Sequence, residues 1–404
     1  MRSLLALALL AGSAAGHGAV TSPRPRQALD ASIAPWNGTV PAYPIPFDDP
    51  NWCEAPDAAS PDPRKLSGAN GQACFWFNNG CDIGCDECDG LAGQKIPCCN
   101  HKFVYNGTGS PDPWGGRGIG LDAAWLAGFN RTAARPATVA HPDRAATVCD
   151  PRLRTVNIDA PCGSAADLWY FSPWRAPGRA PVTDSCGTAG GVLPGQGQGA
   201  AGADYTNTVN ARVGDLGSRL PPLRSGTVWR AGDAVEVAWA GKAWHGGGYS
   251  YRLCPAGGVL DEACFQRTPL AFEGNASLRW GGEGGERVSF DPLSLGWETS
   301  AGTTPTGSAW RKNPIPRGPH AWSFYGASFE PVCEESEACK SALDKAPAPG
   351  VCRCSGEWND QVEIMDTVRI PAGLAPGDYV LGWRWDCEES TQIWASCSDV
   401  TIVS

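Results

Sequence analysis

Short runs that alternate apolar and polar residues, each closed by a turn sequence, fill the second half of this 404-residue chain. Residues 234–239 read AVEVAW after the turn sequence RAGD, and Gly248–Leu253 forms a second run. Three further runs, the first two separated by the turns PAG and APGD, occupy Val362–Ile370, Tyr379–Asp386 and Cys397–Val403. Alternation with a period of two residues is typical of β-strands. Many short strands joined by tight turns predict an all-β protein built as a β-sandwich.

Glycine and proline dominate the rest of the chain. Glycine accounts for 51 residues and proline for 35, while charged residues make up only 18%. This composition favours irregular loops over long amphipathic helices or coiled-coil heptads. The sequence shows no internal repeat, and no linker to an appended module follows residue 362. We therefore expect a single domain over residues 17–404, with a cysteine-rich insertion at about 52–225.

Residues 1–16, MRSLLALALLAGSAAG, have the layout of a secretory signal peptide: one basic residue, an apolar run and then small residues. Ala14 and Gly16 suit the −3 and −1 positions of a cleavage site. Cleavage after Gly16 makes His17 the first residue of the mature protein. No later apolar run approaches the ~18 residues that span a bilayer. We therefore expect a soluble protein that is secreted to the extracellular space.

The chain contains 18 cysteines, an even number. Six of them crowd into one short stretch, with His101 just beyond: Cys74, Cys81, Cys85, Cys88, Cys98 and Cys99. In a cytosolic protein this spacing would suggest zinc, but behind a signal peptide it favours disulfides. N-glycosylation sequons, which agree with a eukaryotic secretory route, begin at Asn37, Asn106, Asn130 and Asn275.

The excess of acidic over basic residues limits the partners that we expect. The net charge is −10 and the isoelectric point is about 5.1. Nucleic acid favours a basic binding surface, so it is not an expected partner. A neutral polymer would not be repelled.

An N-terminal histidine offers metal-binding chemistry that an internal histidine lacks. The α-amine and the ring Nδ1 of His17 can chelate one metal ion together. The α-amine has an ordinary pKa near ~8, so it loses its proton far more readily than a lysine. Amine and imidazole nitrogens in a planar arrangement suit Cu(II), which tops the affinity order of the divalent metals. The alternative is that His17 follows a cleavage site by chance.

His245 is the second candidate ligand. It lies in GKAWHGGGYSYRLCP, residues 241–255, between Trp244 and three glycines. This setting predicts an exposed loop, although a buried core histidine is the alternative. The amine and ring of His17 together with the ring of His245 supply three nitrogens and leave coordination positions open. Open coordination on a redox metal is typical of a catalytic site rather than a storage site.

The C-terminal run from residue 377, GDYVLGWRWDCEESTQIWASCSDVTIV, supplies the remaining candidates. Gln392 and Trp394 are two residues apart, so in extended backbone their side chains share one side. Trp394 could cap the copper axially, or it could pack in the core of the sandwich. Glu388 and Glu389 are candidate acids for proton transfer. Trp383 and Trp385 alternate with Leu381 and are expected to pack in the core.

A histidine after a signal peptide, Ala243-x-His245 with its glycines, and YVLGWRWDCEE…QIWASCSDV resemble a lytic polysaccharide monooxygenase. The resemblance is to the chitin-binding type-4 class in an elongated eukaryotic form, and it covers residues 17–24, 226–255 and 362–404. It implies an immunoglobulin-like or fibronectin III-like β-sandwich with a flat copper-bearing face.

The resemblance also implies roles for individual residues. His17 and His245 match the two histidines that hold one copper ion, and Ala243 matches a small residue that shapes access to it. Gln392 matches a glutamine that forms a hydrogen bond at the copper in some branches. Trp394 stands where the family usually has Tyr or Phe. Because Trp carries no oxygen, the resemblance implies that Trp394 shields the axial side of the copper without binding it.

The activity that the resemblance implies is oxidative cleavage of a β-1,4-linked polysaccharide at C1 or C4, with chitin as first candidate and cellulose as second. Its partners are an external electron donor and oxygen or hydrogen peroxide. Tyr43, Trp52 and Trp76 are candidates for stacking on sugar rings. A non-catalytic copper-binding protein, or a chitin-binding or cell-wall protein of the same fold, remain alternatives.

Overall fold

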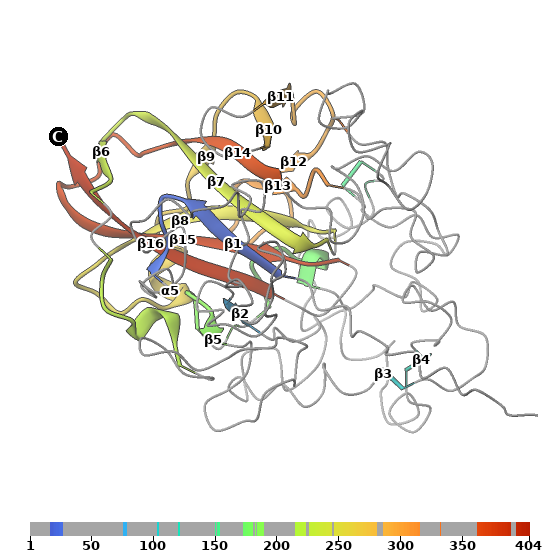
Figure 1. Cartoon of the computed structure of the whole chain (residues 1–404), viewed down its shortest axis with the longest axis horizontal. Coiled ribbons are helices and arrows are strands. Elements are labelled where there is room, and N and C mark those ends of the chain that lie inside the picture. Colours follow the sequence, from blue (N-terminus) through green and yellow to red (C-terminus); the bar gives the residue numbers. More distant parts are fainter. Residues whose placement is uncertain are drawn as a thin grey trace, which may run out of the picture.

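The computed structural model describes the strands of the sandwich and parts of the segments that connect them (Figure 1). The described residues are 17–26, 76–78, 103–104, 120–121, 150, 152–153, 173–180, 182, 184–189, 215–223, 226–244, 246–280, 286–315, 332, 362–388 and 393–404. For a few of these, among them His17, Trp76 and Ala243, only the backbone is described. Four candidate site residues lie outside the described residues: Tyr43, Trp52, His245 and Gln392.

Two large sheets carry the fold. The six-stranded sheet has the order β1 (His17–Ser22), β7 (Ala234–Ala243), β14 (Val362–Arg369), β10 (Ala276–Trp280) and β11 (Arg287–Phe290), with β9 (Ala271–Phe272) paired to β14. The eight-stranded sheet has the order β12 (Glu298–Thr299), β13 (Trp310–Lys312), β8 (Gly248–Pro255), β15 (Gly377–Asp386), β16 (Ile393–Val403), β2 (Trp76–Asn78) and β5 (Thr188–Ala189), with β6 (Val228–Arg230) paired to β16.

The remaining described elements are small. A separate two-stranded sheet joins β3 (Phe103–Val104) to β4 (Gly120–Leu121). The helical turns are η3 (Pro173–Arg175), η4 (Gly217–Arg219) and the α-helix α5 (Glu262–Phe265). In the two large sheets every strand pair is antiparallel except β6 with β16.

The predicted all-β sandwich is confirmed, and all five strands expected from the alternation are present. Four of them are longer than predicted, β8 and β15 by two residues each and β7 and β16 by four each. Strand β7 continues to Ala243, and β16 begins at Ile393 rather than at Cys397. Ile393, Trp394 and Ala395 are all buried, so this end of β16 has apolar residues on both faces. A strand that is buried on both faces loses its alternation, and the sequence pattern therefore missed its beginning.

The core lies between the two sheets. Trp239 on β7 packs against Trp383 and Trp385 on β15, with ring centres 4.9 and 5.2 Å apart. These three rings are fully buried within one continuous cluster that also contains residues of β8, β14 and β16. The expectation that Trp383 and Trp385 pack in the core is confirmed. Each buried indole removes a large apolar area from water, which stabilises the sandwich.

The outer face of the eight-stranded sheet is buried as well. Val380 on β15 packs beneath Phe265 of α5. Gly382 allows this approach, because a Cβ at that position would lie 2.7 Å from the Phe265 ring. Arg384, on the same face of β15, is 1% exposed and donates to the carbonyl oxygen of Ala180 (2.7 Å). Around Val380, Gly382 and Arg384 the eight-stranded sheet is therefore covered on both sides, although Val228 on β6 is 58% exposed.

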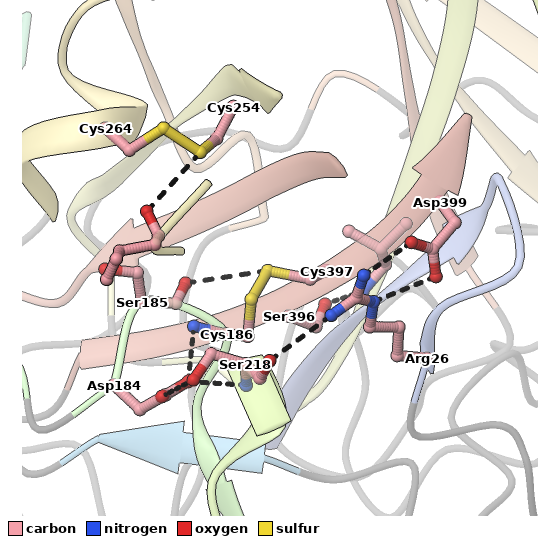
Figure 2. Close-up of a disulfide and its surroundings, with 12 residues drawn as sticks. Arg26, Asp184, Ser185, Cys186, Ser218, Cys254, Cys264, Ser396, Cys397 and Asp399 are labelled. Carbon is pink, nitrogen blue, oxygen red and sulfur yellow. Dashed lines mark hydrogen bonds and ion pairs between the residues drawn. A yellow bond between two sulfur atoms is a disulfide. The ribbon is translucent and has the colours of Figure 1, made fainter. Parts of the chain in front are cut away.

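Two disulfides lie within the described residues. Cys254 on β8 pairs with Cys264 of α5, and Cys186 pairs with Cys397 on β16 (Figure 2). Both attach covering segments to the outer face of the eight-stranded sheet. The predicted disulfides are thus present, although the cysteine-dense stretch from Cys74 to Cys99 contributes none of its cysteines to the described residues.

Among the helices that the structure describes, none has the length and apolar character needed to cross a membrane.

Candidate functional site

Several strand ends meet at one end of the sandwich. The first residue of β1, His17, has Ala243, the last residue of β7, as its Cα partner. On the other sheet, Gly248 at the start of β8 is paired with Asp386 at the end of β15. Trp385, next to that end, is paired with Trp394 near the start of β16. The backbone of His17 and the strand that leads to His245 therefore reach the same end.

The loop that carries His245 is held on both sides, although His245 itself lies outside the described residues. The indole N–H of Trp385 donates to the carbonyl oxygen of Gly246 at 2.7 Å. The backbone N–H of Asn313 donates to the carbonyl oxygen of Gly247 at 2.8 Å. Trp244, before the histidine, is buried against Trp239 with ring centres 5.7 Å apart. The loop is thus anchored to both sheets.

The glycines after His245 differ from the expectation. They were predicted to leave the loop exposed, but Gly246, Gly247 and Gly248 are buried. Gly247 has φ of +75°, and a Cβ there would lie 2.0 Å from the carbonyl oxygen of Asp386. At Gly248 a Cβ would lie 2.3 Å from the ring of Trp174. Glycine is needed here because backbone and tryptophan approach closely, so these glycines serve packing rather than exposure.

A layer of tryptophans lies beneath the first residues of β1. A Cβ at Gly18 would lie 3.1 Å from the rings of both Trp383 and Trp385. Trp394 is 0% exposed, and its ring centre lies 6.4 Å from that of Trp385. Trp394 is thus the neighbour of Trp385, the residue whose indole holds Gly246. Its burial matches the packing alternative, while its neighbours connect it to the loop of His245.

The candidate sugar-stacking residues are only partly described. Strand β2, which carries Trp76, pairs with the start of β16 through Phe77 and Trp394. It also contacts β1. The backbone of Trp76 therefore lies at the same end of the sandwich as the backbone of His17. Tyr43 and Trp52 lie outside the described residues, so their relation to this end stays a prediction.

Lys312 lies at this end too, because its Cα partner is Gly248. Its ammonium donates to the carbonyl oxygen of Arg152 at 3.2 Å and lies 4.9 Å from the centre of the Trp297 ring. Burial lowers the pKa of Lys312 to about 7, and the charge of Glu388, which is fully buried, opposes this shift. Lys312 can therefore change its charge near neutral pH. No sequence pattern distinguishes it from an exposed lysine, and sequence reasoning missed it.

The described side chains include no group of three or more His, Cys, Asp or Glu residues that could hold a metal ion. The side chain of His17 and the whole of His245 are not among them. The donor set that the sequence offers consists of one amine and two imidazoles. Three neutral nitrogens suit Cu(II) and Cu(I) better than they suit Mg²⁺ or Ca²⁺, which prefer oxygen ligands.

No family model matches the chain, and no curated protein matches it. Among solved structures, a chitin-binding domain from Burkholderia pseudomallei matches with 13% identity over 50% of this chain and 68% of that chain, with a TM-score of 0.22. The cellulose-active LPMO CelS2 in complex with copper matches with 16% identity over 54% of this chain and 72% of that chain, also with a TM-score of 0.22. A family 123 glycoside hydrolase from Clostridium perfringens matches with 12% identity over 44% of this chain and 23% of that chain, with a TM-score of 0.17. These likenesses are distant and partial, and the sandwich is defined by the strand pairing described above.

Proposed function

We propose that this protein is a secreted, copper-dependent lytic polysaccharide monooxygenase that oxidatively cleaves a β-1,4-linked polysaccharide, with chitin as first candidate and cellulose as second. One observation carries the proposal. The backbone of His17 is paired with Ala243, two residues before His245. If the mature chain begins at His17, this register brings its amine to the strand end from which His245 follows.

His17 and His245 would hold the copper through the α-amine and the two rings. Bound there, a copper ion that cycles between Cu(II) and Cu(I) supplies the activation of oxygen or hydrogen peroxide. The chain contributes rigidity to the ligands. Trp385 holds the loop of His245 through Gly246, and Gly18 packs against the ring of Trp385. The buried tryptophans would also keep water out of the sandwich at this end.

The substrate would lie across this end of the sandwich. Ala243 leaves space beside the two histidines because its side chain is small. Tyr43, Trp52 and Trp76 would stack their rings on the apolar faces of sugar units. A neutral polysaccharide is compatible with the net charge of −10. Gln392, two residues before Trp394 in the sequence, would donate a hydrogen bond toward the metal side of the substrate if the backbone is extended there.

The direct test is mass spectrometry of the products released from chitin and from cellulose by the copper-loaded protein with ascorbate. Products with an oxidised C1 or C4 end support the proposal and identify the substrate. Copper binding without oxidised products from either polymer would contradict it and favour a non-catalytic copper protein. Adsorption to chitin without copper binding would favour a chitin-binding or cell-wall protein.

His245→Ala is expected to abolish the oxidised products. Because the loop is held by the backbone of Gly246 and Gly247, the free energy of unfolding of the metal-free form should change by only about 0.5 kcal/mol. His141→Ala, which removes a histidine without an assigned role, is the matched control and should keep full activity. A large loss of stability in metal-free His245→Ala would identify His245 as a packing residue.

Trp394→Phe and Trp394→Tyr test the axial position. Neither Trp nor Phe carries an oxygen, and the indole N–H only donates, so Trp394→Phe should leave the Cu(II) electron paramagnetic resonance spectrum unchanged. Trp394→Tyr should bring a phenolic oxygen toward the metal and shift the spectrum. If neither substitution alters the spectrum, Trp394 acts in core packing alone, and the role of Gln392 loses its support.

A further inference from the structure

The N-terminal segment, residues 17–26, crosses from one sheet to the other. In Figure 1, β1 (blue) lies across the red strands β15 and β16, and β1 and β16 contact each other. Strand β2 pairs with Ile393 and Trp394 of β16, and β6 pairs with Thr401–Val403. Between these two partners, no described strand pairs with that edge of β16. The N-terminal segment lies beside this gap.

Two serines of β16 bind the backbone of the segment. The backbone N–H of Val20 donates to Ser396 Oγ at 2.9 Å. The hydroxyl of Ser398 donates to the carbonyl oxygen of Pro23 at 2.8 Å. Both serines are fully buried. Buried hydroxyl groups of this kind fix the groups they bind, because a lost partner leaves a polar atom without water.

A buried ion pair joins Arg26, at the end of the segment, to Asp399 of β16. Arg26 Nε donates to Asp399 Oδ2 at 2.9 Å, and Arg26 Nη2 donates to Asp399 Oδ1 at 2.6 Å (Figure 2). The side chain of Arg26 is 4% exposed and that of Asp399 is 13% exposed. The same carboxylate accepts from the backbone N–H of Leu223 at 2.8 Å. A two-point arginine–carboxylate contact fixes orientation as well as distance.

Arg26 also contacts Ser218, and the residues around Ser218 are themselves linked to β16. Arg26 Nη1 also donates to the carbonyl oxygen of Ser218 at 3.4 Å. Asp184 accepts from the backbone N–H and the hydroxyl of Ser218 and from the backbone N–H of Cys186, which forms the disulfide with Cys397 (Figure 2). The residues around Arg26 therefore cannot shift along β16 independently of it.

The pairing of β1 with β7 is irregular. The register shifts between His17 and Gly18, and again between Val20 and Ser22. A shifted register leaves part of a ladder unpaired and bends the strand locally. The backbone ladder alone therefore fixes the position of β1 less firmly than an uninterrupted ladder would. Side-chain bonds from β16 act on the segment next to and beyond these irregularities.

We propose that Ser396, Ser398 and the Arg26–Asp399 pair are positioning residues that set how far β1 extends along β7, and thereby where the α-amine of His17 lies. Val20 is three residues from His17, so a displacement of Val20 along the strand is passed to the terminus through short, extended backbone. We call these four residues the clamp. The inference rests on the proposed function, because the clamp affects metal binding only if His17 holds a metal ion.

Ser396→Ala tests the clamp. It should weaken Cu(II) binding about 10-fold, the effect expected when a supporting hydrogen bond near a metal site is lost. It should also alter the Cu(II) electron paramagnetic resonance spectrum, which a merely structural role would not change. Ser396→Thr keeps the hydroxyl and should restore both. The matched control is Ser289→Ala, which removes a hydrogen-bonded serine from the edge strand β11 and should leave copper binding unchanged.

Hydrogen exchange of the metal-free protein gives a second readout that needs no copper. The amide of Val20 should exchange at least ~10-fold faster in Ser396→Ala than in the wild type or in Ser289→Ala. Unchanged exchange at Val20 overturns the clamp, as does an unchanged spectrum and affinity in a protein that binds copper. Faster exchange at Val20 in Ser396→Ala, found together with a wild-type protein that binds no copper, would support the clamp and refute the proposed function, so the two failures are distinct.

Discussion

A form of the mature protein that keeps Gly16 before His17 is expected to bind Cu(II) on the order of 100-fold more weakly than the form that begins at His17. The extra residue converts the α-amine of His17 into an amide nitrogen, which no longer serves as a neutral donor. The proposed site would then lose the chelate formed by the amine and the ring of one residue. Joining two donors in one molecule commonly strengthens binding by ~10²-fold or more. Isothermal titration calorimetry of the two purified forms measures the difference.

The control is a form with one glycine added after Ser404, which has the same composition as the form that keeps Gly16. It should bind copper as tightly as the form that begins at His17. The extended N-terminus should also leave the melting temperature of the metal-free protein nearly unchanged, because only one terminal residue is added. Equal copper affinity in all three forms would refute the use of the N-terminal amine as a ligand.

Glu262→Gln is expected to destabilise the metal-free protein by about 3–5 kcal/mol, the usual loss when one partner is removed from a buried ion pair. Glu262 accepts from Arg252 at 2.7 Å and from Arg384 at 2.9 Å. Both arginine side chains are almost wholly buried, at 3% and 1% exposure. Arg384 keeps Asp386 as a partner, but Arg252 loses its carboxylate. Denaturant unfolding followed by tryptophan fluorescence measures the loss.

The matched control is Glu236→Gln, which removes an exposed ion pair. Glu236 binds Arg287, and their side chains are 48% and 43% exposed. Pairs of this kind contribute only about 0–1 kcal/mol. A similar small loss for Glu262→Gln would show that the ion network on the outer face of the sheet is not needed for stability.

Acid gives an independent measure of the same network. Burial pushes the pKa of Glu262 upward, but the charges of Arg252 and Arg384 outweigh burial and lower the pKa from 4.5 to about 2. A lowered carboxyl pKa stabilises the folded state at pH values above 4.5, and this contribution is lost as the pH falls toward 2. Over this pH range the wild type should therefore lose more stability than Glu262→Gln, and the two unfolding curves should converge.

The inner half of the sandwich could be predicted from the sequence, because one physical rule governs it. Trp383 and Trp385 alternate with polar residues, and alternation places them on one face. The outer face could not be predicted in the same way. Arg252 and Arg384 read as ordinary surface residues, and only the covering segments, which include Glu262, make them buried. Cys186 and Cys397 are separated by 211 positions, and spacing does not determine which cysteines pair.

For the candidate site, the sequence proposes residue types but does not predict their setting. The sequence leaves two alternatives for Trp394, core packing and a position beside a metal. Strand alternation predicts only the side of β16 on which a side chain lies, so it cannot choose between them. The burial of the glycines after His245 depends on Trp174 and Asp386, which are distant in the chain. Lys312 owes its lowered pKa to burial by residues that no local pattern identifies.

The covering of the eight-stranded sheet on its outer side makes the protein a three-layered body rather than a two-layered one. The covering segment 173–189 is consequently a poor target for trimming. A shortened version without residues 173–189 would lose the carbonyl oxygen that Arg384 binds and the cysteine that pairs with Cys397. It would also uncover Ile393, now packed against Ala176, Ala180 and Val182. A minimal version of the sandwich would first need that face redesigned for contact with water, because an exposed apolar face promotes aggregation.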